Sequence, residues 1–289
     1  MESRFSPARL APLLGVSEST LKRWVDAGTV RSAKTVGGHR KIALPDLVAF
    51  LRGTGRHVPG FDALGLLAED PGPARSEGAL SPEQFAKLLL DGETPAARTL
   101  LLSRFSAGRP LDEILDRLVG PAMAHVGALW ATRAIDVYQE HVATQRAWRL
   151  LAELRRLLAA PLDDAPLALG GAPEGDPYLL PTLMAELTLR ESGWRTLNLG
   201  PDVPLASLRN AVAHHKPRLV WLSVTSLENR PMFFGDYPTL LTAAQAQGTV
   251  VVLGGQGLTP ALQDRLAAPA VGARLAELKA FAVDARRRA

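Results

Sequence analysis

The chain has 289 residues, of which 47% are apolar, and a formal net charge of +4. This length and composition allow two or three globular domains with cores of their own. The absence of cysteine excludes disulfides, thiolate nucleophiles, iron–sulfur clusters, cysteine–zinc sites and thioether-linked chromophores. No apolar run is long enough to cross a membrane and no secretory leader is recognisable, so we expect a cytoplasmic protein without a membrane partner.

The positive charge is concentrated at the N-terminus, where residues 1–60 contain ten Lys and Arg against four Asp and Glu. Within this region, FSPARLAPLLGVSESTLKRWVDAGTV has the pattern of a helix-turn-helix. A short helix is predicted over residues 7–14, Gly15 permits the turn, and Ser17 can cap a second helix. A basic unit of this kind is expected to be attracted to nucleic acid phosphates.

The next segment, RSAKTVGGHRKIALPDLVAFL, places a Gly-Gly turn between basic strands, which predicts a wing. Residues 5–52 therefore resemble the winged helix-turn-helix of the MerR and excisionase families, in which GGHR recurs in the wing. The resemblance implies binding to a double-stranded DNA operator. The residues expected to contact DNA are Lys22, Arg23, Arg31, His39, Arg40 and Lys41.

The rest of the chain divides by composition into three parts. Residues 56–80 are rich in Gly and Pro and are predicted to form a linker, which leaves 1–55 as the DNA-binding domain. Residues 81–160 show apolar spacings of three and four, which predict a four-helix bundle with helices near 82–91, 94–107, 111–129 and 134–158. Ser81 and Gln84 form the pattern of a capping box at its start.

From residue 165 to 289, short apolar runs alternate with helical patterns. The runs LALGG, TLNLG, RLVWLSV and TVVVLGG predict buried parallel strands covered by helices on both faces, with a weak fifth strand and a closing helix at the end. We therefore predict a multi-domain α and α/β protein that ends in a flavodoxin-like, doubly wound parallel sheet.

Several motifs in the C-terminal parts together narrow the interpretation. Trp130 is followed after nine residues by Glu140 and His141, and LGPDVP, SVT and GGQG occur later in the chain. This combination resembles the cobalamin-binding module made of a helical bundle and a flavodoxin-like domain. Joined to a winged helix-turn-helix, it resembles the CarH/CarA/LitR group of light- or cobalamin-responsive transcriptional regulators, in which adenosylcobalamin is the chromophore.

The resemblance implies a role for each of these residues. Trp130 is expected to cover the upper face of the corrin, with Glu140 and His141 near the same face. An aromatic ring can shield an organometallic bond, and a carboxylate and an imidazole can hydrogen-bond a polar upper ligand. Small residues at the carboxyl ends of strands are expected to leave room for a planar ligand or its nucleotide tail: Ser223, Thr225, Gly254 and Gly255.

The loop GDPYLLP departs from the family pattern. The family has Asp/Glu-x-His-x-x-Gly after the first sheet strand, where the histidine binds cobalt from below and the acid orients the histidine. In this chain the motif falls on Asp176, with Tyr178 in place of the histidine and Pro181 in place of the glycine. A second departure is Ala131, where relatives often have histidine.

Three interpretations of the pocket follow. Cobalamin is held with its own base or water below the cobalt and Tyr178 packed against it. Alternatively, the pocket binds another tetrapyrrole such as biliverdin or haem, with Tyr178, His125 or His141 as a hydrogen-bond partner or axial ligand. In the third interpretation, the pocket is empty and the module serves in oligomerisation.

At the level of function, we predict a non-enzymatic transcriptional regulator that acts as a homo-oligomer, because paired wings can bind repeated half-sites. The alternative from another class is a corrinoid-carrying enzyme subunit. Such a subunit needs the lower histidine and has no use for a wing, so the sequence favours the regulator.

Overall fold

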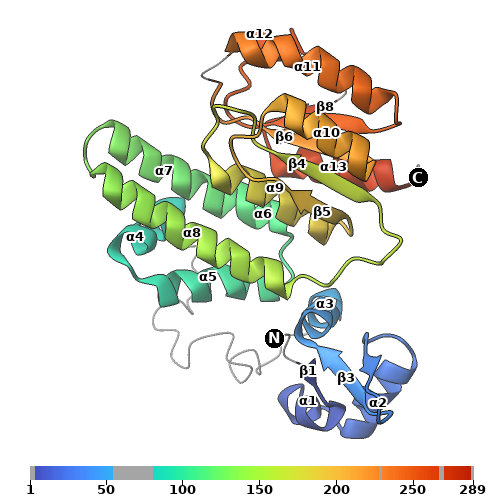
Figure 1. Cartoon of the computed structure of the whole chain (residues 1–289). Helices are drawn as coiled ribbons and strands as arrows, with labels where there is room; N and C mark the ends of the chain where they lie inside the picture. The colour runs from blue at the N-terminus through green and yellow to red at the C-terminus, as the bar shows by residue number, and fades with distance from the viewer. Residues whose placement is uncertain (1–3, 55–80, 228–229, 267–269, 288–289) are drawn as a thin grey trace. The chain divides into compact units, whose positions relative to one another are not determined.

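The computed structural model describes residues 4–54, 81–227, 230–266 and 270–287 (Figure 1). The predicted linker at 56–80 lies outside the described residues. The chain forms two compact units. The helical unit comprises Met1–Pro110 and Arg117–Ala160, and the sheet unit comprises Leu111–Asp116 and Pro161–Ala289.

The N-terminal part of the helical unit is a winged helix-turn-helix, as predicted. Its elements are β1 (Arg4–Phe5), α1 (Pro7–Leu13), α2 (Glu18–Asp26), β2 (Ala33–Lys34), β3 (Arg40–Ala43) and α3 (Leu44–Thr54). The strands form an antiparallel sheet in the order β1-β3-β2, and the turn between β2 and β3 is the wing. Ser17 caps α2 by accepting a hydrogen bond from the Thr20 N–H at 3.2 Å. Fully buried Leu10, Leu21 and Ile42 contribute to the core of this small domain.

The helical bundle contains α4 (Pro82–Asp91), α5 (Thr94–Ser106), α7 (Gly120–Ala131) and α8 (Val137–Leu157). The predicted capping box is present, since Gln84 N–H donates to Ser81 Oγ at 3.3 Å and Ser81 N–H donates to Gln84 Oε1 at 2.7 Å. Arg98 of α5 donates from Nε to Glu153 Oε2 of α8 at 2.8 Å, which links these two helices. A capping box therefore sets the start of α4, and an ion pair holds α5 against α8.

The third bundle helix differs from the prediction, which had one continuous helix over residues 111–129. It consists of α6 (Leu111–Ile114), a π-helical turn at Leu115–Val119, and α7. Its first residues, Leu111–Asp116, belong to the sheet unit. In a π-helical turn the backbone hydrogen bonds span five residues, so the regular α-helical pattern is interrupted here.

The sheet unit has the predicted parallel sheet, including the weak fifth strand. Its strands are β4 (Leu167–Gly171), β5 (Arg195–Asn198), β6 (Leu219–Ser223), β7 (Val250–Gly254) and β8 (Ala270–Gly272). They lie in the order β5-β4-β6-β7-β8, and every neighbouring pair is parallel. This is the flavodoxin-like order, in which the chain reverses direction across the sheet at the first strand.

Helices cover both faces of this sheet (Figure 1). They are α9 (Leu179–Glu191), α10 (Leu205–His215), α11 (Arg230–Gln245), the short α12 (Pro260–Gln263) and α13 (Leu275–Arg287). One core contains α9 and α13 residues with Trp194 and Trp221, and the other contains α10 and α11 residues with Val220 and Leu222. Burial on both faces explains why the strands read as continuous apolar runs.

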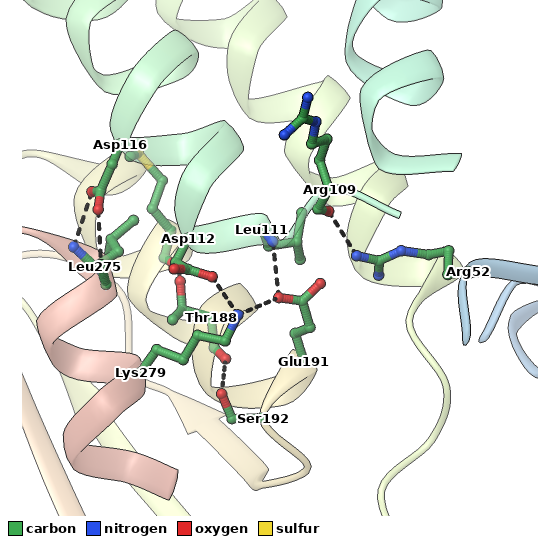
Figure 2. A network of polar contacts seen from close by, with 12 residues as sticks. Arg52, Arg109, Leu111, Asp112, Asp116, Thr188, Glu191, Ser192, Leu275 and Lys279 are labelled. Carbon is green, nitrogen blue, oxygen red and sulfur yellow. Dashed lines mark hydrogen bonds and ion pairs between the residues drawn. The ribbon is translucent and has the colours of Figure 1, made fainter. Parts of the chain in front are cut away.

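A cluster of charged groups holds Leu111–Asp116 against α9 and α13 (Figure 2). The Asp116 carboxylate accepts hydrogen bonds from the backbone N–H groups of Leu275 and Ala276 at 2.9 and 3.0 Å, which caps α13. Lys279 Nζ lies 2.5 Å from Asp112 Oδ1 and 3.6 Å from Glu191 Oε2. These contacts are the physical reason why this segment belongs to the sheet unit.

No helix in the described ranges combines the length and the apolar character needed to cross a membrane.

The substitution Asp116→Ala should lower the free energy of unfolding by about 1 kcal/mol, because it leaves two N–H groups at the start of α13 without their acceptor. Urea-induced unfolding followed by circular dichroism measures this change. The matched control is Asp264→Ala, at an exposed carboxylate after α12. Equal stability of the two variants would contradict a capping role for Asp116.

Candidate functional site

The predicted DNA-contacting residues lie on α2, on the segment after it, and on the wing. Leu21 and Val25 on one side of α2 are buried, whereas Lys22 and Arg23 on the other side are exposed. An amphipathic helix after a tight turn is the element that helix-turn-helix proteins place in the major groove. The structure therefore gives α2 the exposed polar face that this role needs.

Three of the predicted contact residues have partners within the helical unit. Lys22 Nζ lies 2.7 Å from Glu18 Oε1, and Arg40 of the wing lies 2.5 Å from Asp26 Oδ1 at the end of α2. Arg31 donates from Nη1 to the Ala160 carbonyl at 3.1 Å. Exposed ion pairs contribute little free energy, so the pairs of Lys22 and Arg40 can exchange for phosphate contacts. Within the described part of the chain, Arg23 and Lys41 form no ion pair.

The helical-unit residues predicted to meet a ligand lie at the α7–α8 turn. Trp130 is in the last turn of α7 with 46% of its surface exposed, and Glu140 and His141 are in the first turns of α8. Glu140 Oε1 accepts a hydrogen bond from Thr144 Oγ1 at 2.8 Å, and Glu140 Oε2 lies 3.4 Å from His141 Nε2. An exposed indole can cover a flat ligand, and a carboxylate and an exposed imidazole can hydrogen-bond a polar group on it.

The prediction missed two apolar residues beside this group. Tyr138 is 64% exposed and Val142 is 40% exposed, both on α8. Their spacing of four residues places them on the same side of α8, and this spacing was the signal in the sequence that could have identified them.

His125 does not join Trp130, although both are on α7. Five residues correspond to about 140° around a helix, so the two side chains leave it on different sides. The pKa of Glu83 on α4 is lowered mainly by its hydrogen bond with Ser81 and to a smaller extent by His125. His125 therefore lies on a different side of α7 from Trp130 and interacts electrostatically with Glu83 of α4.

In the sheet unit, Asp176 is fully buried in the loop after β4. Its carboxylate accepts hydrogen bonds from three backbone N–H groups: Tyr178 at 3.1 Å, Thr225 at 2.5 Å and Ser226 at 3.0 Å. Burial raises the pKa of the Asp176 carboxyl, and the three N–H donors partly offset this rise. Both carboxylate oxygens therefore accept hydrogen bonds from the backbone. In the family pattern, the acid at this position would instead orient the imidazole of a histidine.

Tyr178 is the residue before α9 and has 46% of its surface exposed. A neutral phenol is a poor ligand for cobalt, and the described residues contain no group of three or more His, Asp or Glu arranged to hold a metal ion. Tyr178 therefore does not replace the histidine of the family pattern as a metal ligand.

Behind Tyr178, side chains fill the space between α9 and the sheet. Trp221 is 2% exposed and donates from Nε1 to Thr182 Oγ1 at 3.1 Å. Thr182 Oγ1 in turn donates to Asn198 Oδ1 at 3.1 Å, and Asn198 Nδ2 donates to Glu186 Oε2 at 3.2 Å. This network satisfies buried polar groups with one another, so it needs no ligand to complete it.

The four small residues lie at the carboxyl ends of β6 and β7, as predicted: Ser223, Thr225, Gly254 and Gly255. The structure explains the need for glycine at position 255 without a ligand. Its φ is +122°, and an added Cβ would lie 2.2 Å from the Val224 carbonyl oxygen. Close packing of two loops therefore accounts for this glycine.

The pH dependence of stability should reveal the buried Asp176. Because its pKa is raised in the folded state, the folded protein binds the proton more tightly than the unfolded chain. Wild type should therefore lose stability relative to Asp176→Asn as the pH rises from about 3.9 through the raised pKa. Urea unfolding at a series of pH values measures this difference, and a difference that grows in favour of wild type would contradict the raised pKa.

Two parts of the chain match known family models. Residues 5–55 match a helix-turn-helix domain, and residues 82–155 match a B12 binding domain. Together with the parallel sheet, they make this a multi-domain α and α/β protein that combines a helix-turn-helix, a helical bundle and a flavodoxin-like domain.

Two curated proteins and one solved structure are among the proteins similar to the chain. The HTH-type transcriptional repressor CarA of Myxococcus xanthus is 25% identical over 222 residues, which cover 74% of each chain. CarH of the same organism is 30% identical over 155 residues, which cover 54% of this chain and 51% of CarH. The monomethylamine corrinoid protein of Methanosarcina barkeri aligns with a TM-score of 0.53 and 19% identity, over 70% of this chain and 96% of its own, which supports the fold.

Proposed function

We propose that the protein is a DNA-binding transcriptional regulator, of the repressor type, whose C-terminal parts sense cobalamin. The observation that carries this proposal is the presence of a helix-turn-helix match and a B12 binding domain match in one chain. CarA and CarH, which it resembles, are both named as transcriptional repressors and neither as an enzyme. The protein therefore acts by binding and not by catalysis.

The DNA-binding part acts as a MerR-like winged helix-turn-helix. Arg23 and Lys22 on α2 contact the edges and phosphates of the major groove, and Lys41 and Arg40 on the wing contact phosphates nearby. The exposed face of α2 and the basic wing support this assignment. Arg31 joins the contacts when it leaves the Ala160 carbonyl.

If cobalamin is bound, Trp130 would cover one face of it, and Glu140 and His141 would hydrogen-bond a polar group on that face. The exposure of Trp130 and the ordered Glu140 carboxylate support this role. Tyr178 offers an exposed aromatic ring on the sheet unit, and its neutral phenol would not ligate cobalt. Bound cobalamin would supply a cobalt centre whose upper ligand can change.

Ligand binding changes the oligomeric state, because two subunits present two wings to repeated half-sites. The contact to the second half-site then becomes intramolecular, which raises the apparent affinity. Loss of the ligand separates the subunits and releases the DNA.

DNA binding predicts a characteristic salt dependence for Arg23→Gln in the full-length chain. Removing one phosphate contact should weaken binding to any duplex and lower the slope of log K against log salt by about 0.9. Fluorescence anisotropy with a labelled duplex measures both values. The control is Arg265→Gln, at an exposed cation of the sheet unit packed on Phe234. No affinity of wild type for any duplex at low salt would refute the DNA-binding function.

The absorption spectrum should identify the ligand. Wild type incubated with adenosylcobalamin should retain it through gel filtration, and Tyr178→His should shift the corrin bands toward imidazole ligation, because an imidazole ligates cobalt and a neutral phenol does not. Leu162→His, at an exposed site of the same unit, should leave the bands unchanged. Retention of biliverdin or haem and not cobalamin would contradict the proposed ligand, and retention of none would contradict a sensor.

A further inference from the structure

The space between α9 and the parallel sheet holds a tryptophan that lies across a glycine. Trp221 of β6 is the register partner of Gly170 in β4, and a Cβ added to Gly170 would lie 2.3 Å from Cδ2 of the indole ring. The ring therefore occupies the place of the side chain that Gly170 lacks. Ala168 and Ala185 belong to the same buried cluster. These small residues leave a hollow between α9 and the sheet, and Trp221 fills it.

Hydrogen bonds make this ring a permanent part of the fold. The indole N–H of Trp221 donates to Thr182 of α9, which is fully buried and donates in turn to Asn198. Asn198 Oδ1 also accepts from the Gly200 N–H at 2.9 Å, so the chain of hydrogen bonds continues into the loop after β5. Moving the indole aside would leave buried polar groups without partners, which costs more than an ordinary hydrogen bond contributes. Trp221 therefore does not open to admit a ligand.

Trp221 lies on the path that a ligand group would take into this space. Side chains two residues apart on a strand share a face, so Ser223 follows Trp221 on the same face of β6, roughly 7 Å nearer the carboxyl edge of the sheet. Ser223 is one of the small residues expected to leave room for a nucleotide tail. A tail that entered at this edge would pass Ser223 and meet the indole ring.

The tail of cobalamin and the Trp221 side chain need the same kind of space. The tail ends in dimethylbenzimidazole, a bicyclic aromatic base that is close to an indole in shape and size. Protein interiors are packed too densely to hold a second bicyclic ring where one is already buried. The sheet unit therefore does not fit a corrinoid whose tail is inserted between α9 and the sheet.

We propose that Trp221 excludes the nucleotide tail of a corrinoid from the sheet unit and takes the place of its base there. This inference rests on the proposed cobalamin-sensing function and specifies the ligand class: a corrinoid that keeps its own base on cobalt, or one that has no tail. Tyr178 agrees with this assignment, because no imidazole at that position displaces the base from cobalt. The buried Trp221 and the exposed Tyr178 thus have one explanation.

The test compares binding of adenosylcobalamin and adenosylcobinamide to the full-length wild type. The two corrinoids share the corrin and the upper ligand and differ in the nucleotide tail. Wild type should bind them with dissociation constants within about threefold of each other in equilibrium dialysis, since the tail makes no contact inside the protein. The absorption spectrum of bound adenosylcobalamin should keep the bands of the base-on form.

Removing the indole should change this selectivity. Trp221→Ala opens a space beside Gly170 and Ala168, so it should favour adenosylcobalamin over adenosylcobinamide by about tenfold through burial of part of the base. Free dimethylbenzimidazole should raise the melting temperature of this variant and leave that of wild type unchanged, because only the variant has a cavity for it.

The matched control is Trp194→Ala. Trp194 is 1% exposed and belongs to the same buried cluster, but it directly precedes β5, at the amino end of the strand and away from the carboxyl edge. This variant should keep the wild-type ratio between the two corrinoids. Circular dichroism shows whether both variants fold. If either does not, Trp221→Leu and Trp194→Leu remove less volume and give the same comparison, and the wild-type ratio needs no variant.

A preference of wild type for adenosylcobalamin of about tenfold or more, or a base-off spectrum of the bound form, would overturn tail exclusion while leaving the cobalamin-sensing function intact. An equal shift of the ratio in Trp221→Ala and Trp194→Ala would show that Trp221 is not the determinant. Retention of neither corrinoid by wild type would instead refute the proposed ligand.

Discussion

The candidate site of the sheet unit depends on one buried carboxylate. Asp176 accepts hydrogen bonds from the N–H groups of Thr225 and Ser226, which joins the loop after β4 to the loop after β6. Its own carbonyl accepts from Asp202 N–H at 3.0 Å, and Asp202 Oδ1 accepts from Gly175 N–H at 2.8 Å, so the loop after β5 is also attached. The carboxyl ends of parallel strands are where such sheets hold ligands, and here that edge is organised around Asp176.

This arrangement decides what Tyr178 can do. The Tyr178 N–H is bound to Asp176 Oδ1, which sets the start of α9 and leaves the phenol ring exposed. Behind it, Trp221, Thr182 and Asn198 complete one another's hydrogen bonds. The sheet unit thus exposes the ring of Tyr178, and the helical unit exposes the ring of Trp130.

The segment at 111–131 shows how tertiary contacts modify a local pattern. Helical periodicity continues through it, yet Asp116 caps α13 and Lys279 pairs with Asp112, which holds the first turn on the sheet unit. The remaining residues continue as α7 in the helical unit after the π-helical turn. One helix therefore connects the two units covalently, and Trp130 lies near its far end.

The sequence by itself determined the order of domains, most helices, and every strand of the parallel sheet, because burial on two faces, capping residues and turn glycines leave local patterns. Its proposal that Trp130, Glu140 and His141 form a ligand site stays a prediction. Only the tertiary structure decided that Asp176 binds backbone N–H groups, that Gly255 serves loop packing, that His125 interacts with Glu83 of α4, and that Leu111–Asp116 belongs to the sheet unit. The physical reason is that these outcomes depend on partners far away in the chain, and the partner of a buried polar group is chosen by the packing around it and not by its neighbours in sequence.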